Sequence, residues 1–123
     1  MTVTVFHNPK CGTSRKLLDA LTERGIEPVV VEYLKAGWTE NQLTALLEKM
    51  GGARPRDILR RRETLAQDMG LLPEDTPDDL ILHAMVQHPI LVERPILETD
   101  TAAVVARPIT RADALLQVLG ARK

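Results

Sequence analysis

The sequence predicts an α/β fold built on a mixed β-sheet, and three observations support that prediction. The chain opens with a β-α-β pattern, continues through a run of helices and closes with a β-β-α pattern. Its 123 residues are typical of a single domain, and 44% of them are hydrophobic, which is enough for one core. We therefore expect one domain that spans residues 1–123.

The opening β-α-β pattern covers the first 33 residues. Residues 3–6 are β-branched or aromatic, which is typical of a short strand. A helix is predicted to begin at or just after Cys11 and to end near Gly25, a residue type suited to the position that follows a helix. A second strand is predicted over residues 28–33, where the run Val29-Val30-Val31 indicates burial on both faces. It should lie parallel to the first strand.

The middle of the chain predicts three helices. Thr39 with Gln42 forms a capping box at the start of the first. Residues 57–69 have helical character and give the second. The run 76–79, Thr-Pro-Asp-Asp, supplies a cap, a proline for the first helical position and acidic residues for the third. We expect these helices to form an insertion over about residues 39–87.

The last part of the chain predicts two strands and a helix. Residues 96–97 and 104–105 are most simply paired as an antiparallel hairpin, and Thr110 with Asp113 predicts a capping box for the final helix. Without the middle helices this element order is that of the thioredoxin fold. The predicted fold is therefore a thioredoxin-like mixed sheet with a helical insertion.

Composition argues against several classes of partner. Sixteen basic and seventeen acidic residues give a net charge of −1, so bulk charge does not support binding to nucleic acid or to a membrane surface. Phe6, Tyr33 and Trp38 are the only aromatic residues, so the core must be aliphatic. No apolar run approaches the ~20 residues that span a bilayer. A small domain with near-neutral charge is expected to be a monomer.

Cys11 is the only cysteine, so an internal disulfide is impossible, and we expect a cytoplasmic protein without a signal peptide. At a helix start, free backbone N–H groups and the helix dipole stabilise a reactive thiolate. Position alone equally allows a small buried hydrophobe. The polar neighbours His7 and Ser14 favour the reactive interpretation, because an imidazolium or a hydroxyl group can stabilise a thiolate. A solvent-facing histidine and a capping serine remain the simpler alternatives.

Arginine outnumbers lysine by eleven to five, and the guanidinium group suits oxyanions. Arg94 and Arg107 share the context Arg-Pro-Ile, in which the proline fixes the local backbone. Arg60 lies in a run of three arginines, of which two are expected to be plain solvated surface. A thiolate near arginines suggests attack on an oxyanion, or docking of the carboxylates of glutathione.

No bound cofactor or metal is predicted. His83 and His88 lack a third ligand, and the chain has no glycine-rich phosphate loop. Because no second cysteine exists, any redox chemistry at Cys11 needs another molecule to resolve the sulfur.

The run His-Asn-Pro-Lys-Cys-Gly-Thr-Ser-Arg at residues 7–15 closely resembles the HNPxCGTSR signature of the glutaredoxin-dependent arsenate reductases of the ArsC type. The resemblance covers nearly the whole chain, in order and with matching spacing. It continues through the segments Tyr33-Leu34, Ile58-Leu59-Arg60, Gln87-His88-Pro89-Ile90-Leu91, Arg94-Pro95-Ile96 and Arg107-Pro108.

This resemblance implies a function and a set of site residues. It implies that the chain reduces arsenate to arsenite with glutathione as co-substrate and glutaredoxin as partner. Cys11 would be the catalytic thiol, with His7 and Ser14 as supports of the thiolate. The oxyanion-binding arginines would be Arg60, Arg94 and Arg107, and Pro95 would be the active-site proline, preceded by a cis peptide bond.

Two other functions stay open. The spacing Cys11-x-x-Ser14 also fits a monothiol glutaredoxin, a glutathione-dependent oxidoreductase that acts on mixed disulfides. A non-enzymatic regulator of the Spx type, which binds a partner such as RNA polymerase, shares the fold. Such regulators typically carry a CxxC switch, and here Ser14 replaces the second cysteine.

Overall fold

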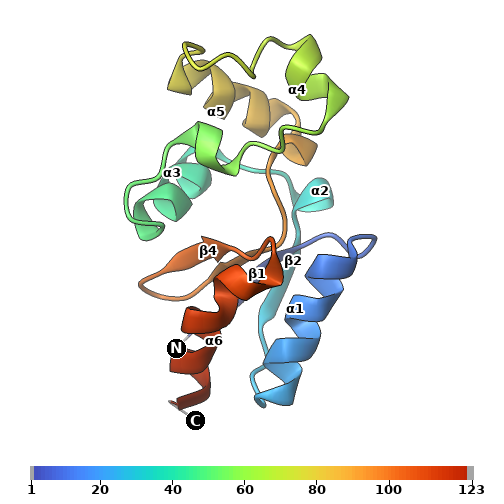
Figure 1. Cartoon of the computed structure of the whole chain (residues 1–123), viewed down its shortest axis with the longest axis vertical. Helices are drawn as coiled ribbons and strands as arrows, with labels where there is room; N and C mark the ends of the chain where they lie inside the picture. The colour runs from blue at the N-terminus through green and yellow to red at the C-terminus, as the bar shows by residue number, and fades with distance from the viewer. Residues whose placement is uncertain (1, 122–123) are drawn as a thin grey trace. The chain divides into compact units, whose positions relative to one another are not determined.

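The computed structural model describes residues 2–121, and the chain divides into two compact units (Figure 1). The first unit comprises the chain up to residue 33 and again from residue 94 onward, and the second comprises residues 34–93. The second unit includes the whole range of the expected insertion. That the two units form one domain with an insertion over about 39–87 stays a prediction.

The first unit contains a four-stranded mixed sheet with the strand order β2-β1-β3-β4. Its strands are β1 (Thr4–His7), β2 (Val29–Glu32), β3 (Ile96–Glu98) and β4 (Ala103–Val105). β1 pairs parallel with β2 and antiparallel with β3, and β3 pairs antiparallel with β4. The parallel opening pair and the closing hairpin are therefore both confirmed.

The predicted burial of the second strand on both faces is wrong. Val29 and Val30 are 55% and 45% exposed. β2 lies at the edge of the sheet, where cover is less complete than at the centre. A run of valines satisfies the preference of a strand for β-branched residues without requiring burial.

Helices α1 (Gly12–Glu23) and α6 (Asp113–Ala121) pack their apolar side chains onto one face of this sheet. The core of the unit is aliphatic, as predicted, and consists of Val3, Val5, Leu17, Leu21, Leu97, Ala106, Ala112, Leu116 and Leu119.

Gly25 follows α1 with φ +70°, and its N–H donates to the carbonyl of Thr22 at 2.9 Å. The capping box predicted at Thr110 is wrong, because Thr110 lies inside a short 3-10 helix, η3 (Ile109–Ala112).

The second unit is helical. Its elements, with α2 starting at the boundary, are α2 (Tyr33–Ala36), α3 (Glu40–Lys49), η1 (Pro55–Ile58), α4 (Thr64–Asp68), α5 (Asp78–Gln87) and η2 (Pro89–Leu91). The capping box of α3 is confirmed: Thr39 Oγ1 accepts from the Gln42 N–H at 3.1 Å, and Gln42 Oε1 accepts in return. Within residues 2–121, no helix has the length and apolar character needed to cross a bilayer.

Two details of the middle helices differ from prediction. The helix predicted over 57–69 is correct only over α4, because Leu59 is extended and forms an antiparallel bridge with Val92. Because of this pairing, η1 ends at Ile58 and the next helix, α4, begins only at Thr64. Pro77 is the N-cap of α5 and not its first helical residue, and the Thr76 hydroxyl donates instead to the carbonyl of Gly70.

Candidate active site

The loop between β1 and α1 holds Cys11 through Asn8. The Asn8 carbonyl accepts the Cys11 N–H at 2.9 Å, and the Asn8 side chain accepts the Lys10 N–H at 3.0 Å. The N–H of Asn8 in turn donates to Ser14 Oγ at 3.3 Å. Asn8 and Ser14 are both buried, so the loop is fixed from both sides, and Cys11 becomes the N-cap residue of α1.

The Cys11 thiol is buried and is surrounded by hydrogen-bond donors. Burial alone raises the pKa of a thiol. Contacts from the Ser14 N–H, the Arg94 side chain, the Ser14 hydroxyl and the Thr13 N–H outweigh that effect and lower the pKa of Cys11 to about 7. The first turn of α1 contains no acidic residue that would oppose a thiolate. The thiolate is therefore more favoured at neutral pH than in an unperturbed cysteine.

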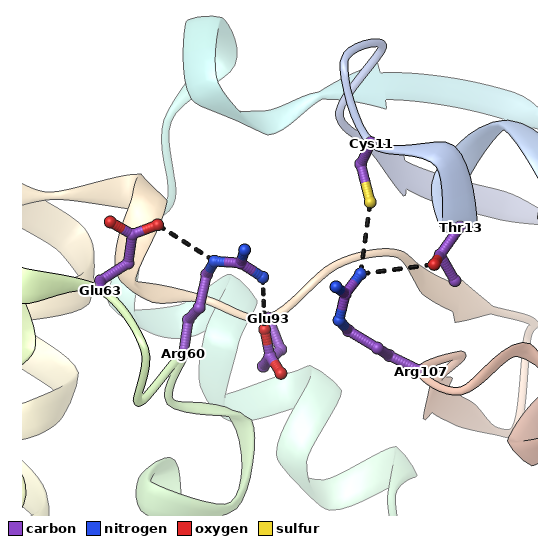
Figure 2. A network of polar contacts seen from close by, with 6 residues as sticks. All are labelled: Cys11, Thr13, Arg60, Glu63, Glu93 and Arg107. Carbon is purple, nitrogen blue, oxygen red and sulfur yellow. Dashed lines mark hydrogen bonds and ion pairs between the residues drawn. The ribbon is translucent and has the colours of Figure 1, made fainter.

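Arg107, which lies 96 positions further along the chain, also contacts the sulfur of Cys11. Its Nη1 donates to Cys11 Sγ and to Thr13 Oγ1, each at 3.4 Å (Figure 2). Arg94 adds further positive charge, and its Nε and Nη1 atoms are buried without a hydrogen-bond partner among residues 2–121. Buried, unsatisfied guanidinium donors are costly in a protein. Next to a thiolate, they are well suited to bind an oxyanion.

Both arginines precede a proline in a cis peptide bond. The Arg94–Pro95 bond is cis, as the sequence resemblance implied, and the Arg107–Pro108 bond is also cis. The sequence pattern shared by these two segments thus corresponds to a shared backbone geometry.

His7 is buried at the end of β1, which excludes the solvent-facing alternative. Desolvation lowers its pKa and outweighs the opposing effect of Glu32, while Arg15 lowers it further. The neutral imidazole is therefore favoured at pH 7. Its Nδ1 atom is buried without a hydrogen-bond partner in the described part of the chain.

Arg60 belongs to the second unit and has carboxylate partners there. Its Nε donates to Glu63 and its Nη1 to Glu93, both at 3.0 Å (Figure 2). Arg61 and Arg62 are exposed, as expected for solvated surface. Sequence reasoning missed both glutamates. The spacing of three residues between Arg60 and Glu63 could have indicated the first pair.

Thr13 was predicted only as a polar neighbour of Cys11 within the signature, and its hydroxyl accepts a hydrogen bond from Arg107 Nη1. No group of three or more histidine, cysteine, aspartate or glutamate side chains within residues 2–121 is arranged to hold a metal ion.

The arrangement around Cys11 can supply a nucleophilic thiolate and at least two guanidinium groups.

Comparison with known proteins identifies the family. The model of the ArsC family matches residues 6–115. The chain belongs to the ArsC family. An ArsC relative from Escherichia coli K12, named arsenate reductase, is 35% identical over 95% of this chain and 80% of its own length. Arsenate reductase ArsI2 of Synechocystis sp. is 42% identical over 86% of this chain and 75% of its own length.

The fold agrees with that of a solved arsenate reductase. The arsenate reductase from Vibrio cholerae superimposes with a TM-score of 0.83 at 36% identity, covering 88% of this chain and 92% of the other. The predicted thioredoxin-like α/β fold and the resemblance to the ArsC family are both confirmed.

Proposed function

We propose that this protein reduces arsenate to arsenite through the Cys11 thiolate, with glutathione and glutaredoxin supplying the electrons. One observation carries the proposal: a thiol with a pKa of about 7 contacts Arg107 and lies beside buried, unpartnered donors of Arg94. Arsenate is a tetrahedral oxyanion that needs both a nucleophile and cationic donors. The relatives from Escherichia coli and Synechocystis are named arsenate reductases.

Each candidate residue has a proposed role. Arg94 and Arg107, together with Arg60, bind the oxyanion and stabilise the charge that develops during attack. Ser14 supports the thiolate through its hydroxyl and its N–H. His7 is assigned to support of the thiolate, as a neutral imidazole that still has one N–H to donate. Pro95 fixes the backbone that carries Arg94.

The proposed reaction begins when the Cys11 sulfur attacks arsenic and one arsenate oxygen leaves as water. Glutathione then attacks the thiol–arsenic(V) adduct. The change from arsenic(V) to arsenic(III) takes two electrons, which thiols supply when two sulfur atoms join as a disulfide. The glutathione sulfur bonds to arsenic as a second oxygen leaves as water. A glutaredoxin thiolate then attacks the glutathione sulfur, the two sulfurs leave as a mixed disulfide, and the electron pair of the broken arsenic–sulfur bond stays on arsenic, which becomes arsenic(III). Water displaces the Cys11 thiol from arsenic, and arsenite leaves.

Arsenate-dependent NADPH consumption tests this proposal. The assay contains glutathione, glutaredoxin and glutathione reductase, with Cys11→Ser as the matched control. We expect turnover by the wild-type protein and none by Cys11→Ser. Absence of turnover, with glutaredoxin shown to be active on another substrate, would contradict the proposal. Disulfide substrates would then test the thiol-oxidoreductase alternative.

A further inference from the structure

The Arg60 side chain is held between two carboxylates, and the backbone of the second unit builds this arrangement. The Arg60 N–H donates to the Leu91 carbonyl at 2.7 Å, next to the antiparallel bridge between Leu59 and Val92. In an antiparallel pair, residues directly opposite one another share a face, and so do residues two apart on one strand. Glu93 is therefore the diagonal neighbour of Arg60 on one face.

Glu63 reaches the same guanidinium from a different direction. The Glu63 N–H donates to the Arg60 carbonyl at 3.1 Å, which closes a turn just before α4. This turn brings the Glu63 carboxylate to Nε of Arg60, while Glu93 takes Nη1. Two of the five N–H donors of the guanidinium are thus committed to carboxylates of the protein itself.

The three side chains are largely withdrawn from water. The Arg60 side chain is 12% exposed, and those of Glu63 and Glu93 are 25% and 22% exposed. Solvent therefore screens these charges less than it screens an exposed pair. Partial burial alone lowers the pKa of Arg60, but the hydrogen bonds to Glu93 and Glu63 outweigh it and leave that pKa raised.

The charges around Arg60 sum to a negative value. One guanidinium cation faces two carboxylates, so the ionised cluster carries a net charge of −1. An incoming oxyanion is attracted by Arg60 and repelled by both glutamates. By contrast, Arg107 contacts the Cys11 sulfur and a threonine hydroxyl.

We propose that Glu63 and Glu93 are positioning residues that fix the Arg60 guanidinium and weaken its attraction for the arsenate oxyanion. This inference rests on the proposed function, because it assigns Arg60 to oxyanion binding. Glutamine at either position keeps a carbonyl oxygen that can accept the N–H of Arg60 but removes one negative charge. Alanine removes both the charge and the acceptor.

The test compares arsenate reduction by Glu63→Gln, Glu93→Gln and the double variant with that of the wild type. We expect each glutamine to lower KM for arsenate by about three- to ten-fold with little change in kcat, because a charge repelling the bound anion is lost. When Arg60→Ala is added to the glutamine variants, the decrease in KM for arsenate should disappear. The double alanine variant, Glu63→Ala with Glu93→Ala, should show a smaller decrease in KM than the double glutamine variant. Its kcat should also fall, because the Arg60 side chain is no longer fixed.

Asp78→Asn is the matched control. Asp78 pairs with Arg54 in the same unit through two hydrogen bonds, of 2.9 and 3.2 Å. The variant therefore also removes the negative charge of a carboxylate that is paired with an arginine. Its KM for arsenate should stay at the wild-type value. An unchanged or raised KM in both glutamine variants would overturn the inference. So would an equal decrease in Asp78→Asn, or a gain that persists without Arg60.

Calorimetric titration with arsenate in the Cys11→Ser background separates this inference from the proposed function. The same glutamine substitutions should tighten arsenate binding by a similar factor without any turnover. If the wild type binds arsenate but does not reduce it, the proposed reaction fails while the titration still decides the role of the glutamates. If the glutamine variants bind no more tightly than their parent, the inference is wrong whatever the activity.

Discussion

At the scale of single residues, the reactivity of Cys11 is a balance between burial and local hydrogen bonding. Burial protects the thiol but disfavours its charged form. Ser14 acts on this balance twice, because its N–H and its hydroxyl both lower the pKa of the sulfur. The same hydroxyl accepts the N–H of Asn8, so the group that stabilises the thiolate also fixes the loop that carries it.

The rate of Cys11 alkylation by iodoacetamide should rise with pH with a midpoint of about 7. Because the pKa is lowered, the thiolate predominates above that pH and is lost as the pH falls through it. Ser14→Ala removes one of the stabilising contacts and should shift the midpoint upward. A wild-type midpoint near 9, the usual range of an unperturbed thiol, would contradict the assigned environment.

Arg94→Ala and Arg107→Ala should each lower kcat/KM for arsenate by about 10²–10³, the typical effect of removing one donor that stabilises developing charge. Arg62→Ala is the control, since Arg62 is exposed and should leave the rate unchanged. Steady-state kinetics at saturating glutathione measure the three variants. A loss of less than about five-fold for both Arg94→Ala and Arg107→Ala would remove these arginines from the proposed oxyanion site.

The candidate site could be predicted from the sequence where its contacts are local. Cys11 and Ser14 lie within one helix turn, so their spacing alone placed them together. Glu93 could not be found this way, because it reaches Arg60 across 33 positions through a bridge that no local pattern indicates. Half of the negative charge around Arg60 therefore comes from a long-range contact, and the other half comes from Glu63, three residues along the chain.

At the scale of elements, the two strand pairs and the Thr39 capping box were predicted correctly, whereas the capping box at Thr110 was predicted wrongly and the bridge between Leu59 and Val92 was not predicted. The capping box at Thr39 is encoded within four residues. The helix predicted over 57–69 is absent before α4, where Leu59 pairs with Val92. Tertiary context here overrides helix propensity, which is worth only tenths of a kcal/mol per residue.

Thr39→Ala should lower the free energy of unfolding by about 1 kcal/mol, because it leaves an N–H at the start of α3 without its side-chain acceptor. Thr44→Ala is the matched control in the same helix. Thr44 is exposed within α3, where alanine has the higher helix propensity, so this change should be neutral or slightly stabilising. Urea unfolding monitored by circular dichroism compares the two, and equal losses of stability would argue against a specific capping contribution.

At the scale of the whole molecule, the candidate site residues are distributed unevenly over the two units. The first unit carries the thiol, its hydrogen-bond donors and two of the three candidate arginines. The second contributes Arg60 together with two carboxylates that oppose its charge. Among the described residues, the contacts reported for the Cys11 thiol therefore come from the first unit, and the carboxylate partners of Arg60 come from the second.

The 123 residues contain one cysteine, so a single chain cannot supply both sulfur atoms of a disulfide. Arsenite formation should therefore depend on added glutathione, and without any thiol we expect less than one arsenite per chain. Oxidised glutathione should modify the wild-type protein with one glutathione per chain and leave Cys11→Ser unmodified, as mass spectrometry of the intact protein can show. Multiple turnovers without an external thiol would contradict this mechanism, because arsenic(V) takes up two electrons and Cys11 alone cannot provide them repeatedly.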